Sequence, residues 1–352
     1  MKKSKNYIYT LILSLLVCSC GKNPDESNSE VDLSILNGPT IIYDLVGDNF
    51  FENRINNSNS DRVFLSDDYS RFNVRISPDK QRIAYVKNLV FYPFGIQNNG
   101  VPSVNISNNM GKTENVLMTY DSLSVYFIDW ISNNRLAVSS REGSLHYITI
   151  INIEGEVLFR EQVESFYLIY MLPDEQHLVT YNYVQFGILD VLTYDFQEFN
   201  PCEEIDDFHL EETDYFIFLP FYAGSSFIFN LDSDEYLECN LNDYSYKIYP
   251  LLNANERLLY ANSTYHIYYN YSDEQLKLYE ENELISTADI NRYVCEIGLY
   301  LTEGNELYLI GESKEIDDEG VIIKVNFDSN HLTKLTNHGE DKFISNFMYY
   351  DY

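Results

Sequence analysis

Residues 76–86 have the sequence Ile-Ser-Pro-Asp-Lys-Gln-Arg-Ile-Ala-Tyr-Val. An apolar residue comes first, and a polar turn follows, in which Pro78 presets the backbone angle φ that a tight turn requires. The β-branched and aromatic residues after the turn favour a strand. This stretch therefore predicts two antiparallel strands joined by a short turn.

Weaker copies of this unit recur along the chain. Each copy places a polar turn before an apolar strand, at residues 131–138, 172–179, 252–259 and 301–308. The strand markers of the five units lie at positions 83, 136, 178, 258 and 307, in steps of 53, 42, 80 and 49 residues. The step of 80 equals two steps of 40, and a weak unit at 214–218 fills the gap. A period of about 40 to 50 residues holds roughly four short strands, which is typical of a β-propeller blade.

The unit resembles the repeat of TolB-type, WD40-like β-propellers, in which a Ser-Pro-Asp turn precedes a strand of the type Ile-Ala-Tyr. The match is good at 76–86 and partial at 131–157, 171–179 and 321–336, and Lys80 stands where the family usually carries glycine. The resemblance implies an all-β chain with a single β-propeller of six or seven four-stranded blades. A pair of β-sandwiches is the alternative, but its turns would recur at shorter spacing.

Strand-like segments at both ends of the chain fit a closed ring. Residues 40–45 and 347–352 are rich in apolar and aromatic side chains and lie outside the six counted turn units. A propeller must close its first blade on its last to hide exposed strand edges. We therefore expect these two segments to contribute to ring closure.

The first 21 residues have the features of a bacterial lipoprotein signal. Lysines at positions 2, 3 and 5 precede an apolar run at 7–17, which is too short to cross a hydrocarbon core of ~30 Å as a helix. The sequence Val-Cys-Ser-Cys that ends at Cys20 resembles the lipobox of lipoprotein signal peptidase. The resemblance implies a cleaved signal peptide at 1–19, a lipidated Cys20 with a flexible tether at 20–37, and a propeller domain at 38–352. An ordinary secretory signal with Cys20 as an unmodified thiol is the alternative.

Two short motifs favour a place at the cell envelope. An interrupted acidic signal at 22–26 resembles the one that follows the lipidated cysteine of surface-exposed Bacteroidetes lipoproteins. Residues 121–123, Asp-Ser-Leu, match the short O-glycosylation motif of that phylum, which makes Ser122 a candidate glycosylation site. We expect a protein anchored in the outer membrane by its lipid, with both the cell surface and the periplasm open as the side it faces.

The net charge limits the possible partners. The chain carries 55 Asp and Glu residues against 23 Lys and Arg residues, a formal net charge of −32. Nucleic-acid binding depends on Lys and Arg side chains that neutralise phosphates, so nucleic acid is not expected as a partner. Anionic lipid headgroups are disfavoured for the same reason. The charge is typical of a soluble, exposed domain.

The sequence contains no recognisable catalytic motif. It lacks a Gly-rich phosphate loop, a nucleophile elbow, a His-Glu-x-x-His sequence and metal-spaced cysteines. Histidines are scattered at positions 146, 177, 209, 266, 331 and 338, and a histidine without a catalytic partner is more often structural. No catalytic residue, metal site or cofactor is therefore predicted.

The remaining clusters have structural explanations. Cys202, Cys239 and Cys295 are expected to be small buried thiols. Acidic segments at 232–235 and 315–320 lack the spacing of a calcium loop, so solvated loops between strands are expected. Tyrosine-rich segments at 265–271 and 349–352 favour packing between strands and blades, because tyrosine has a high strand preference.

Two classes of function remain after these exclusions. The first is a lipid-anchored binding or scaffold protein of the cell envelope, whose propeller binds a protein, a peptide or a glycan without catalysis. The second is a polysaccharide hydrolase or lyase that uses carboxylates in the central funnel. The two classes differ in whether two or three Asp or Glu side chains converge at the mouth of the channel.

Overall fold

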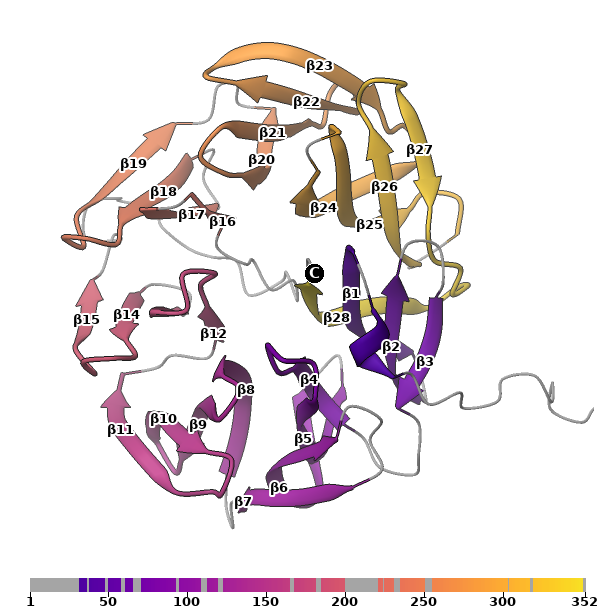
Figure 1. Ribbon diagram of the computed structural model, residues 1–352. Coiled ribbons are helices and arrows are strands. Elements are labelled where there is room, and N and C mark those ends of the chain that lie inside the picture. The colour runs from indigo at the N-terminus through magenta and orange to yellow at the C-terminus, as the bar shows by residue number, and fades with distance from the viewer. Residues whose placement is uncertain are drawn as a thin grey trace, which may run out of the picture.

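Seven four-stranded antiparallel sheets form a ring in the computed structural model of the chain (Figure 1). The structure describes residues 32–36, 38–47, 50–57, 61–65, 71–92, 95–108, 113–119, 123–164, 168–181, 185–199, 221–223, 225–230, 235–250, 255–302, 304–316 and 319–350. Each sheet is one propeller blade, so the all-β propeller predicted from the sequence is confirmed, and its blades number seven. In the described residues, no helix is long and apolar enough to cross a bilayer.

We number the blades in chain order from the first complete one. The short 3-10 helix η1 (Leu33–Ile35) precedes them all. Blade 1 contains β4 (Arg71–Ile76), β5 (Arg82–Tyr92), β6 (Gly95–Asn108) and β7 (Glu114–Thr119). Blade 2 contains β8 (Leu123–Ser132), β9 (Arg135–Glu142), β10 (Leu145–Asn152) and β11 (Val157–Val163). Blade 3 contains β12 (Leu168–Met171), β13 (His177–Tyr181), β14 (Phe186–Asp190) and β15 (Phe196–Phe199).

The second half of the ring follows the same order. Blade 4 contains β16 (Phe221–Tyr222), β17 (Ser226–Asn230), β18 (Glu235–Asn240) and β19 (Tyr246–Pro250). Blade 5 contains β20 (Glu256–Ala261), β21 (Tyr265–Asn270), β22 (Gln275–Glu280) and β23 (Glu283–Asp289). Blade 6 contains β24 (Tyr293–Leu301), β25 (Glu306–Ser313), β26 (Gly320–Asn326) and β27 (His331–Lys334). Blade 7 contains β28 (Lys342–Tyr350), β1 (Thr40–Gly47), β2 (Phe50–Asn57) and β3 (Asp61–Leu65).

The turn between β4 and β5 has the geometry predicted for the repeat unit. The amide of Lys80 donates to the carbonyl oxygen of Ser77 at 2.8 Å, and the hydroxyl of Ser77 donates to Asp79 Oδ1 at 2.7 Å. Lys80 has a φ of 58°, a left-handed conformation that favours glycine. This conformation agrees with the glycine that the resembling propellers usually carry at the position.

One of the described units has a different place in its blade from the others. In blades 1, 2, 3 and 6 the predicted strand is the second of its blade. The unit at 252–259 leads instead into β20, the innermost strand of blade 5. The second strand of blade 4 is β17, and the weak unit at 214–218 lies outside the described residues. A polar turn before an apolar strand marks any hairpin strand, so this pattern alone does not count strands within a blade.

A second repeat, which was not predicted, ends the third strand of blades 2, 3, 4 and 6 and the second strand of blade 5. An Asn or Asp side chain accepts hydrogen bonds from the amides that follow, which is an Asx turn. These residues are Asn152, Asp190, Asn240, Asn270 and Asn326. The next residue is apolar or aromatic in each case, and its amide donates to a carbonyl oxygen just before a neighbouring strand. An Asx–apolar pair is thus a further sequence signal of a blade.

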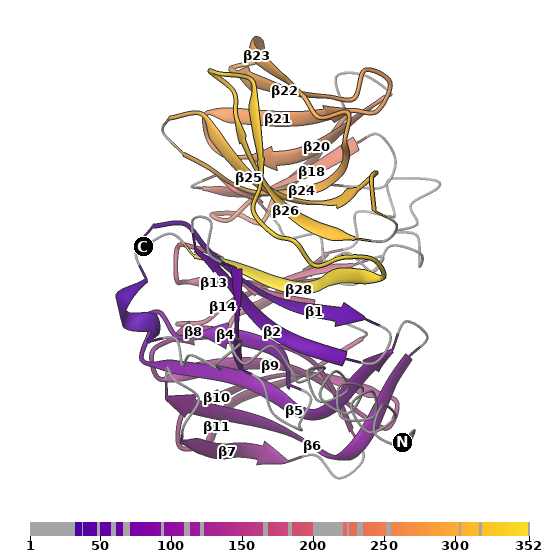
Figure 2. The ribbon, with the colours of Figure 1, turned by 90° about the vertical axis from the view of Figure 1, so that its right-hand side faces the viewer.

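Ring closure joins the two ends of the described chain. All eight residues of β1 pair with the antiparallel β28, with one irregularity between Tyr43 and Asp44. Figure 2 shows β28 beside β1, next to the strands of blade 1. The expectation that the segments at 40–45 and 347–352 contribute to ring closure is confirmed for their described residues.

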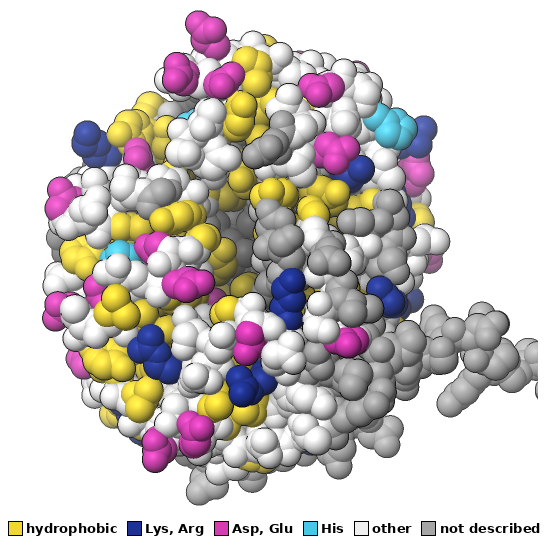
Figure 3. All heavy atoms as spheres, in the orientation of Figure 1, with side chains coloured by type: hydrophobic (Ala, Val, Ile, Leu, Met, Phe, Trp, Pro, Cys, Tyr) yellow, Lys and Arg dark blue, Asp and Glu magenta, His cyan; other side chains and the backbone are white. Residues whose placement is uncertain are grey.

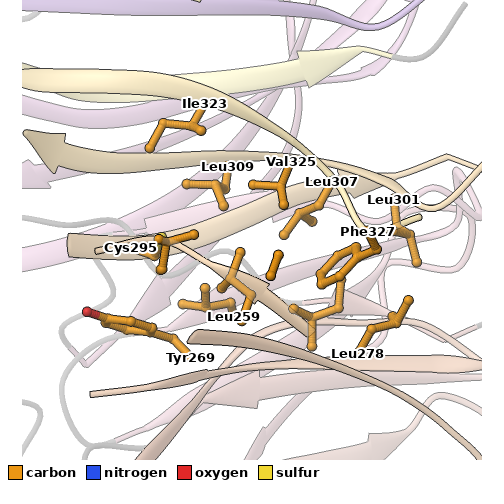
Figure 4. Packing of buried hydrophobic residues seen from close by; sticks show 14 of the residues in the cluster. Leu259, Tyr269, Leu278, Cys295, Leu301, Leu307, Leu309, Ile323, Val325 and Phe327 are labelled. Atoms are coloured by element: carbon orange, nitrogen blue, oxygen red, sulfur yellow. The ribbon is translucent and has the colours of Figure 1, made fainter. Parts of the chain in front are cut away.

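Buried side chains between neighbouring blades form the core. Separate clusters lie between blades 1 and 2, 2 and 3, 3 and 4, 5 and 6, and 7 and 1. Figure 4 shows the interface of blades 5 and 6, where Leu259 and Tyr269 lie opposite Leu307 and Val325. Successive side chains of a strand point to opposite faces of the sheet, so each blade packs against both neighbours.

Candidate binding site at the central channel

The innermost strands of the blades surround the axis of the ring. These strands are β4, β8, β12, β16, β20, β24 and β28. Figure 3 shows that the face toward the viewer is hollowed at this axis, with hydrophobic side chains on part of the rim. The channel is therefore the place where side chains from several blades can meet one ligand.

Polar side chains join blades 1 to 3 near the channel. The indole Nε1 of Trp130 on β8 donates to the carbonyl oxygen of Arg75 on β4 at 3.1 Å. Asp129 accepts hydrogen bonds from the amide of Trp130 at 2.9 Å and from the amide of Met171 on β12 at 2.8 Å. Burial raises the pKa of Asp129, and the positive charge of Arg75 opposes this rise. Asp129 therefore acts as a connector between blades 2 and 3.

A second polar connection joins blades 7, 1 and 2. Asp44 on β1 accepts a hydrogen bond from Asn53 Nδ2 at 2.6 Å and one from the amide of Asn73 at 3.2 Å. Asn73 lies on β4 with a φ of 58°, and its side-chain amide donates to the carbonyl oxygen of Tyr126 on β8. A left-handed residue inside a strand persists only when its surroundings hold it, and these bonds supply that restraint.

Blades 4 to 7 are joined by aromatic side chains instead. Phe221 on β16 meets Tyr260 on β20 edge to face, with ring centroids 5.7 Å apart. Tyr300 on β24 stacks on Tyr349 of β28, with centroids 4.8 Å apart. Through these residues the core between blades 4 and 5 is continuous with the core between blades 6 and 7. The three tyrosines are partly buried and pack against this continuous core.

Tyr170 on β12 completes this set of aromatic residues. Burial raises its pKa, and the charges of Asp129 and Arg75 and the hydroxyl of Tyr260 also act on it. Tyr170 packs against the core between blades 3 and 4, and the Tyr260 hydroxyl lies 3.4 Å from Asn262 Nδ2, which donates to it. Burial also raises the pKa of Tyr260. Both hydroxyls are therefore neutral at pH 7.

We name these five residues, Tyr170, Phe221, Tyr260, Tyr300 and Tyr349, the aromatic wall. The wall was not predicted as a site. An apolar residue precedes tyrosine in the four innermost strands that supply its tyrosines, at 169–170, 259–260, 299–300 and 348–349. That pair is the sequence signal from which the wall could have been found, but it requires knowledge of which strands are innermost.

Close backbone packing fixes part of the wall. At Gly298 on β24, an added Cβ would lie 2.8 Å from the Cβ of Tyr260 and 2.9 Å from the carbonyl oxygen of Leu259. Such distances are shorter than ordinary van der Waals contact, so only glycine lets β24 approach β20 this closely. The absence of a side chain at this position therefore helps to place Tyr260 against blade 6.

The described carboxylates of the innermost strands accept hydrogen bonds from other groups and do not form a pair with each other. Among the described side chains of these strands the acids are Asp129 and Glu256. Glu256 Oε1 accepts hydrogen bonds from Lys277 Nζ at 2.6 Å and from Asn270 Nδ2 at 3.2 Å. Asp129 accepts backbone amides, so neither acid forms a glycosidase-like pair with the other. Within all the residues that the structure describes, no group of three His, Cys, Asp or Glu side chains is placed to hold a metal ion.

The two sites predicted from the leader and the glycosylation motif, Cys20 and Ser122, lie outside the described residues. Five of the six histidines are described, and His209 is not. His177 Nδ1 lies 2.7 Å from Asp174 Oδ2 in the turn before β13, which is a structural role. Cys239 and Cys295 are buried, as expected, and Cys202 lies outside the described residues.

His338 lies in a polar cluster beside the closing blade. Its Nε2 is 3.1 Å from the hydroxyl of Tyr43, which donates to Asp61 Oδ1 at 2.6 Å. Its Nδ1 is 3.6 Å from Asp61 Oδ2. Burial first, and then the charge of Arg54, lower the pKa of His338 to about 4. The imidazole is therefore neutral near pH 7.

The expectation that the segment 315–320 is a solvated loop is wrong for Glu319. Glu315 is exposed, but the side chain of Glu319 is fully buried. Its carboxylate accepts hydrogen bonds from Lys334 Nζ at 2.6 Å and from the amides of His338 and Gly339 at 3.0 and 3.1 Å. Burial alone would raise the pKa of Glu319, but these donors hold it below its usual range. These three hydrogen-bond donors replace the water that the Glu319 carboxylate loses, which allows it to be buried at the junction of blades 6 and 7.

The tyrosine-rich segment 265–271 has the structural role that was predicted. Tyr268 packs in the cluster shared with blade 4, and Tyr269 packs against blade 6. Tyr271 follows the strand and is 48 % exposed. Of the segment 349–352, Tyr349 belongs to the aromatic wall, and residues 351 and 352 lie outside the described residues.

Comparisons with known proteins support the fold but do not show a family to which the chain belongs. No protein-family model matches the chain, and no curated protein matches it. A solved structure of a protein from Lactobacillus plantarum is similar with a TM-score of 0.56 and 8% identity, over 89% of this chain and 99% of that one. TolB from Acinetobacter baumannii gives a TM-score of 0.43 and 12% identity, over 91% of this chain and 67% of that one.

A chain of the nidogen/laminin complex gives a TM-score of 0.43 and 10% identity, over 72% of this chain and 94% of that one. The match to the Lactobacillus plantarum protein supports the fold alone, and the other two carry no argument about function. The protein is thus a seven-bladed β-propeller, and its function must be argued from its own residues.

Proposed function

We propose that the protein is a lipid-anchored binding protein of the cell envelope, which uses the channel of its propeller to hold a protein, peptide or glycan ligand. The hollow at the axis of the ring, surrounded by the innermost strands of the blades, is the observation that carries this proposal. A concave place where several structural elements meet is the usual location of a ligand site. The described channel acids, Asp129 and Glu256, already hold backbone amides, a lysine and an asparagine, which favours binding over acid–base chemistry.

The anchor rests on the sequence of the leader. A lipidated Cys20 would attach the propeller to a membrane through the polar segment at 20–37. Such a tether would leave the channel free to meet ligands in the surrounding space. Outer-membrane attachment and surface exposure are proposed on the same ground.

Membrane attachment is tested by fractionation of cells that express the full chain. Cys20→Ala should move the protein from the membrane fraction to the soluble fraction. Cys18→Ala is the matched control, because it removes a neighbouring thiol but leaves the proposed lipid-bearing residue. A Cys20→Ala protein that remains with the membrane would contradict the anchor.

Binding is tested by affinity purification of the tagged full chain from gently solubilised envelopes. A protein recovered in stoichiometric amount would identify a protein ligand. Its absence would direct the search to glycans and peptides. A chain that retains no protein, peptide or glycan in either search would refute the proposed function.

A further inference from the structure

Three side chains of blade 5 meet on one face of its sheet, and they carry a carboxyl, an amide and an amine group. Glu256 on β20 lies directly opposite Asn270 on β21. Asn270 pairs with Gln275 on β22, and Lys277 shares a face with Gln275 because it is two residues further along the strand. Diagonal neighbours of this kind are within reach of a long side chain. We name Glu256, Asn270 and Lys277 the blade 5 triad.

One carboxylate oxygen holds both nitrogen atoms of the blade 5 triad. Glu256 Oε1 accepts hydrogen bonds from Lys277 Nζ at 2.6 Å and from Asn270 Nδ2 at 3.2 Å. The second oxygen, Oε2, is buried and has no hydrogen-bond partner among the described residues. The side chain of Glu256 is 2% exposed, and Asn270 is also buried. The carboxyl group therefore brings an amine and an amide together in a place that contains little water.

The backbone polarises the side-chain carbonyl group of Asn270. Asn270 Oδ1 accepts hydrogen bonds from the amides of Ser272 and Asp273, each at 2.9 Å, in the Asx turn that follows β21. Two amide donors on one carbonyl oxygen stabilise the negative charge that develops there when a nucleophile attacks the carbon atom. The Asx turn thus makes the side chain of Asn270 a better electrophile.

We propose that Lys277 and Asn270 become joined by an intramolecular isopeptide bond, with Glu256 as the acid–base catalyst. Lys277 Nζ first transfers a proton to Glu256, and the free amine then forms a bond to Cγ of Asn270. The bond between Cγ and Nδ2 breaks. Glu256 gives its proton to the departing nitrogen and takes another from the attacking nitrogen. Ammonia leaves, and a neutral secondary amide remains between β21 and β22.

The first proton transfer is the slow part of this reaction. The hydrogen bond to Glu256 raises the pKa of Lys277, so the ammonium is the resting form. The transfer produces a neutral amine and a neutral carboxyl group, and burial favours neutral groups over charged ones. The bond therefore forms once, after folding, and needs no cofactor. Both partners belong to the chain itself, so the reaction is independent of any ligand of the channel.

Blade 6 contains the same three residue types in a more open setting. Glu306 Oε1 accepts hydrogen bonds from Lys324 Nζ and Asn326 Nδ2, both at 3.3 Å. The side chain of Glu306 is 30% exposed. Water solvates this carboxylate and the lysine, so the proton transfer that frees the amine is disfavoured. We expect no bond here, which makes Lys324 an internal control.

Trypsin distinguishes the two states of Lys277, because it cleaves after a lysine only when the amine is free. The purified full chain is denatured, digested and analysed by tandem mass spectrometry. With the bond, residues 258–292 should appear as one peptide whose mass is lower than that of its sequence by one ammonia molecule. Fragment ions should place the link between Asn270 and Lys277. Cleavage after Lys324 should be complete in the same digest.

Two variants assign the roles within the blade 5 triad. Glu256→Gln removes the group that moves the protons, and Lys277→Arg keeps the positive charge but removes the amine. Neither variant should lose ammonia, and both should be cleaved after residue 277. Their folding is checked by circular dichroism. If Glu256→Gln does not fold, the native chain and Lys277→Arg still decide whether the bond forms.

Three results would overturn the proposal. The first is complete cleavage after Lys277 in the native chain, even after prolonged incubation of the folded protein. The second is loss of ammonia while Lys277 is still cleaved, because Asn270 would then have cyclised onto its own backbone. The third is a bond that forms equally in folded Glu256→Gln, which would remove the carboxyl group from the reaction.

Discussion

Removal of the last strand should open the ring and unfold the propeller. A chain that ends before Lys342 lacks β28, with which all eight residues of β1 pair. It also lacks the buried side chains of Ile344 and Phe347, which are 3% and 4% exposed. The perturbation therefore removes an inner strand and part of the interface between blades 6 and 7.

The size of the loss follows from these contacts. Burial of the two side chains contributes about 1.5 to 3 kcal/mol each. A strand pair of this length makes roughly eight backbone hydrogen bonds, each worth about 0.5 to 1.5 kcal/mol net. The combined loss is on the order of 10 kcal/mol, which is comparable to the whole stability of a typical folded protein.

Trp130 gives the measurement a convenient probe. It is the single tryptophan of the chain, and it is buried between blades 1 and 2, away from the cut. Urea unfolding is followed by its fluorescence and by far-ultraviolet circular dichroism. The truncated chain should aggregate or lose its cooperative transition by both signals.

The control removes only residues 351 and 352, which leaves all of β28, and it should behave as the full chain does. A truncated chain with an unchanged melting temperature would refute the reasoning about closure. A change in circular dichroism without a change at Trp130 would mean that the blades unfold independently, which would also contradict it.

Three further changes test other contacts. Trp130→Phe removes the donor to the carbonyl oxygen of Arg75 and should lower the free energy of unfolding by about 1 to 3 kcal/mol, as measured by urea denaturation followed by circular dichroism. Gly298→Ala forces a Cβ against Tyr260 and should cost about 1 to 3 kcal/mol, whereas an equal melting temperature would show that β20 and β24 can separate freely. The native chain should lose free energy of unfolding as the pH falls from about 6.5 to 4, and His338→Gln should lose less of it. The measurement is urea denaturation at a series of pH values.

The sign of the pH effect follows from the depressed pKa of His338. The unfolded chain binds a proton near pH 6.5, while the folded chain binds it only near pH 4. Stability is therefore fully present above about pH 6.5 and falls as the pH drops toward 4, by about 3 kcal/mol in total. Burial raises the pKa of Asp61, which has the opposite effect on stability, so the profile of the variant is compared with that of the native chain over the same pH range. Parallel pH profiles of the two proteins would contradict this account.

Local turn chemistry made the fold predictable. The Ser-Pro-Asp turn at 77–79 predicts two strands, because proline and aspartate favour a turn of the backbone within a few residues. A turn signal does not say which strand of a blade it precedes, and the unit at 252–259 leads into an innermost strand while other units lead into a second strand. The number of blades depended on pairing between β1 and β28, which lie at opposite ends of the sequence.

The candidate site was harder to predict than the fold. Phe221 meets Tyr260 only after blades 4 and 5 have packed together, and Tyr300 meets Tyr349 only after blades 6 and 7 have done so. Burial of Glu319 likewise depends on donors from the last residue of β27, Lys334, and from the connection that follows it, His338. The spacing of residues along the sequence does not show which side chains meet in the folded ring, so these residues resembled ordinary strand and loop positions.

Pairing of β1 with β28 also determines the order in which the protein can fold. The two strands are separated by nearly the whole described sequence, since β1 ends at Gly47 and β28 begins at Lys342. Contacts of such high contact order slow folding, so closure should be the last event, after the six complete blades have formed. Until the final residues have been synthesised, the nascent chain is an open arc with an unpaired edge on β1. That edge is the segment most exposed to aggregation during synthesis, and a chaperone that protects the nascent chain would be needed there first.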